Sequence, residues 1–555
     1  MSIRKKYRLH NLILLSILFL AACKQEHVTP IAPWIPYDES GELAQNVLHQ
    51  SERMHYKLIQ SKILDKNEIW KNVSDQISTF SEEDYQRLKP FVLEQDIPSI
   101  QLHIRSGDLS YEKLTQWYLY RIVRYENDKT KSLNNIIAIN PEAVKEARKR
   151  DRKKSAGDHP IYGMPILLKD NIDMEGLSTT AGAVALLSNK ASDAFIVERI
   201  KEKGGIILGK VNLSEWANYL CLSCPNGYSA VGGQTLNPYG RRIFDTGGSS
   251  SGSATSMAAN YAAAAVGTET SGSILSPSSA NSVVGLKPTV GLLSRAGIVP
   301  ISSTLDTPGP ITRNVTDNAI LLSAMSGKDS SDIATRVNPG IKKYWEDLNS
   351  ASLKGIRFGV FKNYLNDSIY NLSVEKIKSL GSITIEFVPE QTNLQGFSTL
   401  LSADMKVDLP GYLTSYASGN ILFRSVADIA KYNMSDSLLR IPYGQSRFKE
   451  IISQNISPEE LHQLKTKLHN DGVSYFEKPM VQYNLDAILS INNRSAGYAA
   501  AARYPCLTVP MGYRKTGEPA GITFITRPFE EDKLLKMGYA FEQASRIRKL
   551  AAEYN

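Results

Sequence analysis

Histidines are few in this sequence, and none is placed where metal or acid–base chemistry would need it. Eight His residues are spread over 555 positions, and none lies in residues 245–293, the stretch richest in Gly and Ser. The HExxH pattern of zinc proteases and the GxxxxGK[ST] pattern of phosphate-binding loops are also absent. Zinc, nucleotide and nicotinamide chemistry are therefore not indicated, and we expect neither a metal nor a cofactor.

The sequence has no large excess of positive over negative charge, and its cysteines are few. A formal net charge of +8 is small for 555 residues, and no basic helix is interleaved with aromatic residues, so we expect no nucleic-acid partner. Cys221 and Cys224 lie close together without a second Cys or His pair for zinc, which leaves a local disulfide or two unreactive thiols open. Cys506 is interpreted as a small core residue.

The first 22 residues have the pattern of an export signal. Four basic residues precede the apolar run 12–20, which is too short to span a bilayer comfortably. The run ends in LAAC, which is similar to a bacterial lipobox, whose cysteine (here Cys23) carries lipid and becomes the mature N-terminus. A plain signal peptide with an incidental cysteine is the alternative. Because Lys24 is not the Asp that often marks inner-membrane retention, lipid anchoring to the outer membrane or cell surface is favoured.

Beyond the signal, the pattern indicates an extension followed by one large domain. Residues 23–95 begin with a Pro-rich tether and continue with polar helical patterns at 40–64 and 82–93, which we interpret as an extension lying against the domain 96–555. Within that domain, strands and helices alternate, which predicts an α/β fold with partly parallel strands. Strands are expected at 136–139, 163–171, 205–208, 356–360, 383–388, 487–491, 507–510 and 520–524. Helices are expected from Ser110 onward and at 140–154, 193–203, 213–219, 254–265 and 530–548.

Residues 245–293 are dense in Gly, Ser, Ala and Thr and almost free of charge. A flexible linker of this composition would lack the apolar runs at 257–266 and 283–286. Small residues alternating with buried-type segments instead favour a packed centre, in which backbone approaches backbone or a ligand closely. We interpret this stretch as the catalytic centre of the chain.

One pattern in this centre, GSSSG at 248–252, satisfies the GxSxG motif of a nucleophile elbow. It would make Ser250 the nucleophile and would need a preceding central strand and a later histidine. Residues 237–242 do not have a strand pattern. Only His462 and His469 follow, both in a polar helical stretch. The elbow is therefore the less favoured alternative.

Several long motifs, in order, resemble the amidase signature family. They are GMPILLKDNID (163–173), TTAGA (179–183), GGSSSGSA (247–254), TETSGSI (268–274), NSVVGLKPTVGLLSRAGIVP (281–300) and DTPGPITRNVTD (306–317). LSEWAN (213–218), SAVGGQTLNPYG (229–240) and YPCLTVPMGY (504–513) point to its peptide-amidase-like branch. The resemblance covers about residues 97–548 and implies one α/β domain, a large mixed β-sheet with helices on both faces.

The resemblance also implies a Ser–Ser–Lys triad. Its strand-end lysine corresponds to Lys169, its relay serine to Ser249, and its nucleophile to Ser273. The family further implies a cis peptide bond between Gly248 and Ser249. Its oxyanion hole would be formed by the backbone N–H groups of Thr270, Ser271, Gly272 and Ser273. Without the motifs, Lys169 would be interpreted as a surface lysine and the two serines as packing residues.

Physical chemistry is consistent with such a triad. A serine hydroxyl is a poor nucleophile and needs a base beside it. A lysine buried among small residues loses the hydration of its charged form, so its pKa falls and it acts as a neutral base. Ser249 would then relay a proton between Ser273 and Lys169. The neighbouring Ser250 is a candidate substrate contact, with a turn-forming role as the alternative.

One residue departs from the family pattern. Relatives commonly have Asp or Gly where this chain has Ser271; the backbone donor is kept, but a side chain lining the site differs. We expect a serine amidase that hydrolyses a carboxamide, with a peptide C-terminal amide or another small-molecule amide as substrate. The alternatives are an amidotransferase A-like subunit, which an export signal contradicts, and a non-catalytic surface lipoprotein that uses the fold for binding. The oligomeric state is not indicated.

Overall fold

A computed structural model describes residues 31–153, 159–390 and 392–555. The expected signal segment and the lipid-accepting Cys23 lie outside the described residues. Over the ranges that are described, no helix combines the length and apolar character needed to cross a membrane.

One mixed sheet of eleven strands runs through the chain, in the order β1-β3-β2-β6-β8-β7-β12-β13-β11-β9-β10. Its two ends contain parallel groups, β3-β2-β6 and β11-β9-β10, whereas its centre, from β8 to β13, is antiparallel. The strands are β1 (Ile136–Ile139), β2 (Pro165–Lys169), β3 (Ile206–Val211), β6 (Ala264–Glu269), β7 (Val284–Lys287), β8 (Thr307–Thr312), β9 (Arg357–Phe361), β10 (Ile383–Phe387), β11 (Ala487–Ile491), β12 (Cys506–Tyr513) and β13 (Pro519–Ile525). A separate hairpin pairs β4 (Tyr228–Ser229) with β5 (Gly233–Gln234).

Helices flank this sheet. They are α2 (Ser40–Asn46), α3 (Lys66–Ile77), α4 (Glu82–Val92), α5 (Ile97–Ser106), α6 (Tyr111–Glu126), α7 (Ala143–Lys153), α8 (Phe195–Glu202), α9 (Glu215–Asn218), α10 (Ser251–Ala258), α11 (Leu275–Ala280), α12 (Val315–Met325), α13 (Ser368–Ser379), α14 (Phe397–Ser415), α15 (Val426–Met434), α16 (Ser437–Arg440), α17 (Ser446–Ser453), α18 (Pro458–Gln482), α19 (Ala496–Ala502) and α20 (Glu531–Ser545). Helices α10 and α11 contact each other and the central strands, whereas α8, α12, α20 and α13 form another contiguous row against the sheet. The expected α/β fold with a large mixed sheet is confirmed.

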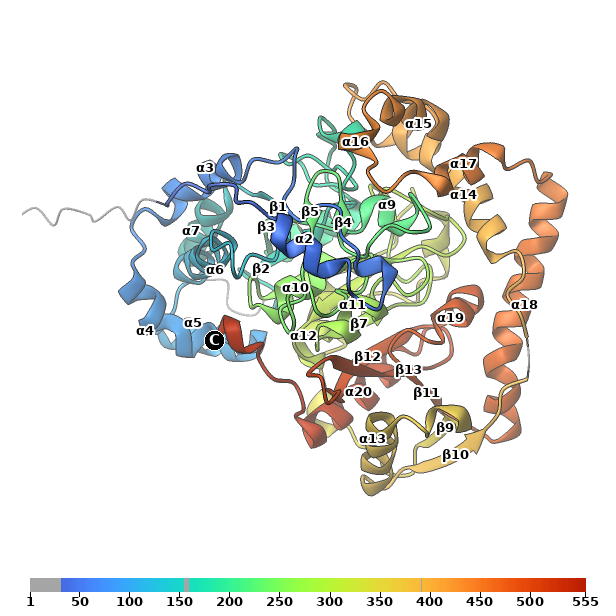
Figure 1. Cartoon of the computed structure of the whole chain (residues 1–555). Coiled ribbons are helices and arrows are strands. Elements are labelled where there is room, and N and C mark those ends of the chain that lie inside the picture. The colour runs from blue at the N-terminus through green and yellow to red at the C-terminus, as the bar shows by residue number, and fades with distance from the viewer. Residues whose placement is uncertain (1–30, 154–158, 391) are drawn as a thin grey trace, which may run out of the picture.

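The N-terminal and C-terminal parts of the chain are packed together. Figure 1 shows α3 to α7 on one side of the sheet, with the C-terminus beside α5, and α14 to α18 on the opposite side. The buried Arg121 of α6 donates to the carbonyl of Tyr554, and Arg548 forms an ion pair with Glu94. Residues of the N-terminal extension such as Trp34 and Trp70 belong to the same buried apolar cluster as the central strands.

Most predicted elements are found, within a few residues of their expected ends. The strand prediction at 487–491 coincides with β11, and Ser110 caps α6 by accepting a hydrogen bond from the Lys113 N–H at 3.1 Å. Two helix predictions are wrong in extent. Of residues 40–64 only α2 is an α-helix. The helix expected at 254–265 is α10, which ends at Ala258; the last two residues of the expected range, Ala264 and Ala265, begin the buried strand β6.

The described cysteines differ in whether they form a disulfide. Cys221 and Cys224 form a disulfide, which decides between the two alternatives left open by the sequence. Cys506 is a buried free thiol at the start of β12, as its interpretation as a core residue predicts.

Helix α10 approaches strand β3 closely at one glycine. A Cβ atom added at Gly252 would lie 2.4 Å from the Asn212 carbonyl oxygen and 3.0 Å from Val211 Cβ. By contrast, a Cβ added at Gly41, in α2, would meet nothing within 4 Å. The close approach holds the segment before α10, which contains Ser249, against the ends of β2 and β3.

We therefore predict opposite effects for two helix substitutions. Gly252→Ala forces α10 away from β3 and lowers the free energy of unfolding by about 1–3 kcal/mol. Gly41→Ala raises it by roughly 0.4–1 kcal/mol, because alanine restricts the unfolded chain without a clash. Denaturant unfolding of both variants measures the difference. Equal stability of the two variants would contradict the packing described here.

Candidate active site

The predicted base lies where two parallel strands end. Lys169 is the last residue of β2, and Leu168 pairs with Val266 of the neighbouring β6. The Lys169 Nζ lies 2.8 Å from Ser249 Oγ, and it donates to Thr268 Oγ1 at 2.8 Å and to the Thr268 carbonyl at 3.1 Å. Lys169 and Ser249 are both fully buried. The structure therefore brings the predicted base and the predicted relay into direct contact.

The environment of Lys169 favours its neutral form. Burial removes water from the ammonium group and lowers the pKa of Lys169 to about 7, a shift that the charges of Asp306 and Glu269 partly oppose. The contrast with Lys210 on β3 is direct, because the Lys210 ammonium is equally buried but lies 3.1 Å from the Asp170 carboxylate. In the described part of the chain, Lys169 forms no ion pair.

The loop that carries Ser249 is fixed by small residues and backbone contacts. The Gly248–Ser249 peptide bond is cis, as the family resemblance implies. The Ser214 N–H donates to the Ser249 carbonyl at 3.1 Å, and the Ser250 N–H donates to the Ser273 carbonyl at 3.1 Å. A Cβ at Gly248 would lie 2.5 Å from Ser214 Oγ. The loops of Ser249 and Ser273 are thus joined directly through backbone.

A buried carboxylate holds the loop of Ser273. Glu269 ends β6, and its carboxylate accepts hydrogen bonds from the N–H groups of Gly272 (2.7 Å), Ile274 (2.7 Å) and Leu275 (3.0 Å). Three backbone donors that surround Ser273 are therefore engaged by one side chain. Ser273 itself is 9% exposed, and its hydroxyl has no hydrogen-bond partner within the described ranges. The arrangement leaves this hydroxyl available for reaction.

The hydrogen bonds of this loop correct one member of the expected oxyanion hole. The Gly272 N–H points to Glu269 and is not free to bind an oxyanion. Sequence alone does not reveal this, because the loop curls around Glu269 with Gly272 at φ +87°. The backbone N–H groups of Thr270, Ser271 and Ser273 are the remaining candidates.

The predicted role of Ser250 as a substrate contact is also corrected. The sequence makes it a candidate substrate contact, but it is fully buried, and its hydroxyl donates to the Thr268 carbonyl at 3.0 Å while accepting from the Thr268 N–H at 3.2 Å. Both functions of the hydroxyl are used to attach the loop to β6. His462 and His469 belong to α18, whose His469 Nδ1 lies 3.0 Å from the Ala501 carbonyl oxygen. The nucleophile-elbow alternative therefore loses its nucleophile.

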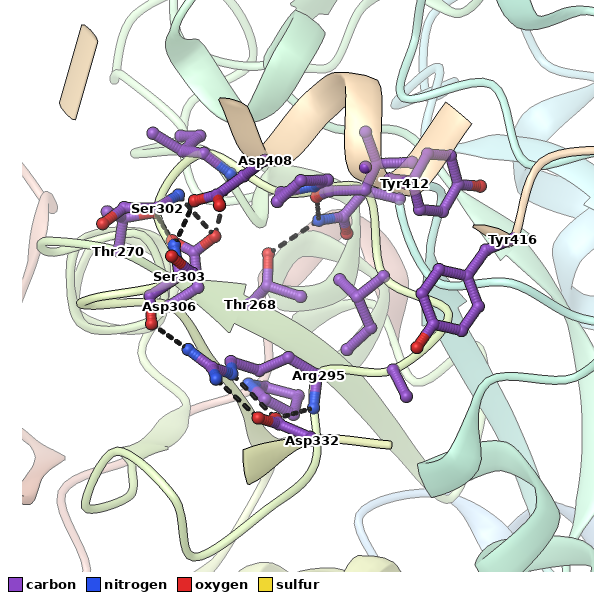
Figure 2. A pocket seen from close by; sticks show the side chains of 18 of the residues that line it. Thr268, Thr270, Arg295, Ser302, Ser303, Asp306, Asp332, Asp408, Tyr412 and Tyr416 are labelled. Atoms are coloured by element: carbon purple, nitrogen blue, oxygen red, sulfur yellow. Dashed lines mark hydrogen bonds and ion pairs between the residues drawn. The ribbon is translucent and has the colours of Figure 1, made fainter. Parts of the chain in front are cut away.

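A cavity of about 350 Å³ opens at Thr268 and Thr270, and Lys169, Ser249 and Ser273 are not among the described residues that line it. Figure 2 shows Thr268 and Thr270 on its inner wall, Asp408 and Tyr412 on the helix that crosses it, and Tyr416 directly after that helix. That helix is α14, which Tyr412 attaches to the core by donating to Asp173 Oδ1 at 2.7 Å. The other residues that line the cavity are Asn171, Ala217, Arg295, Ala296, Ile298, Val299, Pro300, Ile301, Ser302, Ser303, Asp306, Thr307, Pro308, Ser331, Asp332, Val407, Gly411 and Ser415.

The charged residues of the cavity have hydrogen-bond partners, and two of them, Arg295 and Asp332, pair with each other. Arg295 donates from Nε to Asp332 at 2.8 Å and from Nη2 at 2.5 Å (Figure 2). Asp306 accepts hydrogen bonds from Thr270 Oγ1 at 2.5 Å and from two backbone N–H groups at 2.8 Å. Burial raises the pKa of Asp306 to about 6. Asp306 thus connects the cavity wall to the backbone segment in front of Ser273.

Sequence analysis missed Glu269, Thr268 and the cavity residues Arg295 and Asp306. For Glu269 a signal existed, since it is the only acidic residue between 246 and 293. An isolated carboxylate in an apolar stretch must be paired or hydrogen-bonded when buried. For Thr268 no signal existed, because threonine is common in buried strands.

Known proteins match this chain over most of its length. The family model described as Amidase matches residues 113–393, which include Lys169, Ser249 and Ser273. A probable amidase from Arabidopsis thaliana is 37% identical over 478 residues, covering 82% of this chain and 91% of the relative. The X-ray structure of native peptide amidase from Stenotrophomonas maltophilia is 36% identical, with a TM-score of 0.79, and covers 83% of this chain and 98% of that one. The A-type subunit of the glutamyl-tRNA(Gln) amidotransferase from Prosthecochloris aestuarii is 30% identical, over 79% of this chain and 97% of its own.

The role of Glu269 yields a prediction. Glu269→Gln places an amide NH₂ against backbone N–H groups, so we expect the free energy of unfolding to fall by about 1–3 kcal/mol. We also expect labelling of Ser273 by a fluorophosphonate probe to slow by at least about tenfold, because the loop loses its position. Glu126→Gln is the matched control. Glu126 is buried, lies outside the cavity lining, accepts hydrogen bonds from the Leu133 N–H and the Ser132 hydroxyl, and forms an ion pair with Lys66 at 3.6 Å. It should lower stability but leave the labelling rate unchanged.

Proposed function

The chain belongs to the amidase family, and from this premise we propose that it hydrolyses a carboxamide through a covalent acyl–enzyme on Ser273. The enzyme is a hydrolase that acts on amide C–N bonds. The observation that carries the proposed mechanism is the 2.8 Å contact between Lys169 Nζ and Ser249 Oγ, made where the lysine is buried without an ion-pair partner in the described part of the chain.

In the proposed first step, Ser273 Oγ attacks the amide carbonyl carbon. The Ser273 proton passes to Ser249 while the Ser249 proton passes to neutral Lys169, which becomes an ammonium. The tetrahedral intermediate collapses when its C–N bond breaks, and the proton returns through Ser249 to the leaving nitrogen. Ammonia or an amine departs and an ester to Ser273 remains. Water then attacks this ester with the same groups as base and acid, and a carboxylate is released.

The backbone N–H groups of Thr270, Ser271 and Ser273 are proposed to stabilise the oxyanion of both tetrahedral intermediates. One such donor is worth about 3 kcal/mol in the transition state. The engagement of the Gly272 N–H by Glu269 supports this assignment, because it fixes the loop and leaves its other donors to the substrate. The side chain of Ser271 is half-buried and borders the site without removing a donor.

For the substrate, we favour a carboxamide of peptide type. The likeness to a peptide amidase of Stenotrophomonas maltophilia supports this class, and the cavity beside Thr268 and Thr270 has room for an acyl group. The Lys169–Ser249 contact argues against the alternative that the chain is a non-catalytic lipoprotein. An amidotransferase component remains the second candidate, since one is among the relatives; the export signal, which would remove the chain from cytoplasmic tRNA, counts against it.

The LAAC sequence supports a proposal on location. The protein is exported, cleaved before Cys23 and anchored by lipid to a bacterial membrane, the outer membrane being favoured over the inner one. No metal or cofactor takes part in the proposed reaction. Globomycin treatment or Cys23→Ala, followed by membrane fractionation, tests the anchor.

The triad predicts ammonia release from carboxamides by the protein freed of residues 1–23. Ser273→Ala removes the nucleophile and Lys169→Ala removes the base, so each should lower kcat by at least about 10⁴-fold. Fluorophosphonate labelling should be lost in both. Ser250→Ala is the control and should remain labelled, since its hydroxyl only contacts β6. Activity that persists in Ser273→Ala would refute the mechanism, and a wild-type protein that neither reacts nor labels would favour a binding function.

The state of Lys169 predicts the pH dependence. Lys169 must be neutral, and its pKa is about 7, so kcat/KM should fall about tenfold per pH unit below pH 7 and level off above it. The negative charge of Asp306 raises the pKa of Lys169. Asp306→Asn should therefore lower this pKa and move the acidic limb to lower pH. The exposed Asp428→Asn should leave the limb in place. A limb that moves to higher pH in Asp306→Asn would contradict the assignment of Lys169 as the base.

A further inference from the structure

The cavity that Thr268 lines, one hydrogen bond from Lys169, has the size of an acyl site, an assignment that rests on the proposed function. When the substrate is a carboxamide, its leaving group is ammonia, which needs almost no room. A cavity of about 350 Å³ that reaches Thr268 and Thr270 is therefore left for the acyl part. The chemistry of its wall then decides which acyl groups are accepted.

The inner wall contains an acceptor without a donor. Asn171 lines the cavity and is 2% exposed. Its Nδ2 donates to Thr268 Oγ1 at 3.1 Å and to the Val299 carbonyl at 3.3 Å, which fixes the orientation of the amide. Its Oδ1 is buried and has no partner among the described residues. A buried acceptor of this kind costs free energy unless a donor arrives. Thr268 Oγ1 accepts from both Asn171 and Lys169, so the Asn171 amide is connected to the proposed base by two hydrogen bonds.

The outer wall offers a second acceptor and no free cation. Asp408 on α14 accepts a hydrogen bond from the Ser303 N–H at 2.6 Å, and no cation forms an ion pair with it within the described ranges. Among the described residues that line the cavity, Arg295 is the one basic residue, and its Nε, Nη1 and Nη2 all donate to Asp332 or Ser303. Asp332 neutralises Arg295, and Asp306 and Asp408 add two further carboxylates, so the cavity wall is acceptor-rich and net negative.

We infer that this cavity selects acyl groups that bear hydrogen-bond donors, with an N–H near the scissile amide bound by Asn171 Oδ1 and an ammonium further out bound by Asp408. Acyl groups that bear a carboxylate find no donor there and are repelled. Purely apolar acyl chains leave Asn171 unpaired. Short peptide amides with a free amino terminus fit this acceptor set, whereas fatty and aryl amides do not.

Four substrates with one common leaving group test the inference. They are glycyl-leucinamide, acetyl-leucinamide, succinyl-leucinamide and acetyl-N-methyl-leucinamide. In the last compound, a methyl group replaces the hydrogen on the α-nitrogen of the leucine residue. We expect kcat/KM to decrease from the glycyl to the acetyl to the succinyl compound. We expect N-methylation to lower kcat/KM by at least about tenfold, because a site built to bind an N–H rejects an analogue without it.

Two variants separate the acceptors. Asn171→Ala should abolish most of the penalty for N-methylation while preserving the charge order, and Asp408→Asn should abolish the advantage of the glycyl compound while preserving the penalty. Asn318→Ala is the matched control for the loss of a buried amide. Asn318 is fully buried, its Oδ1 is also unpartnered among the described residues, and it lies on α12 outside the cavity lining. Its ratios between substrates should equal those of the wild type. Because only ratios are compared, loss of folded protein does not affect the result.

The outcomes keep this inference apart from the proposed function. Hydrolysis of all four compounds at similar kcat/KM, or an undiminished N-methyl penalty in Asn171→Ala, overturns the inference and leaves the amidase mechanism standing. If none is hydrolysed, the proposed function fails for this substrate class. The inference is then decided by protection of Ser273 from a fluorophosphonate probe, for which the same order of the four compounds is expected. Equal or absent protection overturns it.

Discussion

The site depends on the burial of one lysine among neutral acceptors. A buried ammonium is stable only when a carboxylate pairs with it, as Asp170 pairs with Lys210 at the adjacent strand end. Lys169 instead has a serine hydroxyl and the groups of Thr268 around it, and its pKa is lowered to about 7. The two neighbouring strand ends thus hold two buried lysines in opposite electrostatic situations, and only the unpaired one is suited to act as a base.

Small residues make that burial possible. Gly248 and Gly252 allow the segment around Ser249 to lie against the Ser214 and Asn212 backbone regions, where any Cβ would overlap its neighbours. Glu269 then accepts hydrogen bonds from three N–H groups that follow it, and the backbone of Ser273 is joined to the Ser249 loop through the Ser250 N–H. The density of Gly and Ser in this stretch is therefore a packing requirement, and the single carboxylate within it is the anchor around which the loop is wound.

The cavity is built from parts that lie far apart in the chain. Its inner wall comes from β6 and from the segment after β2, whereas its outer wall comes from α14, in the irregular region between β10 and β11 (Figures 1 and 2). The Tyr412–Asp173 hydrogen bond attaches the outer wall directly to the segment that follows the strand of Lys169. In the mechanism and selectivity that we propose, the reacting groups and the acyl site lie on different elements, so substitutions in α14 would alter the accepted acyl group without touching Lys169, Ser249 or Ser273.

The sequence by itself determined the order of the parts around the site: a buried strand ending in Lys169, two Gly- and Ser-rich turns, and the α/β class. These features follow from local periodicity and from motifs of fixed spacing. Each such pattern lies within one continuous stretch of the chain, so it can be recognised without the tertiary structure. It did not determine that Gly272 is bound to Glu269, that Ser250 is held by Thr268, or that Asn171 and Asp408 border one cavity. Those properties depend on which hydrogen-bond partner a polar group meets in three dimensions. Only the tertiary structure decides this, because it brings together residues such as Asn171 and Asp408 that are separated by more than two hundred positions.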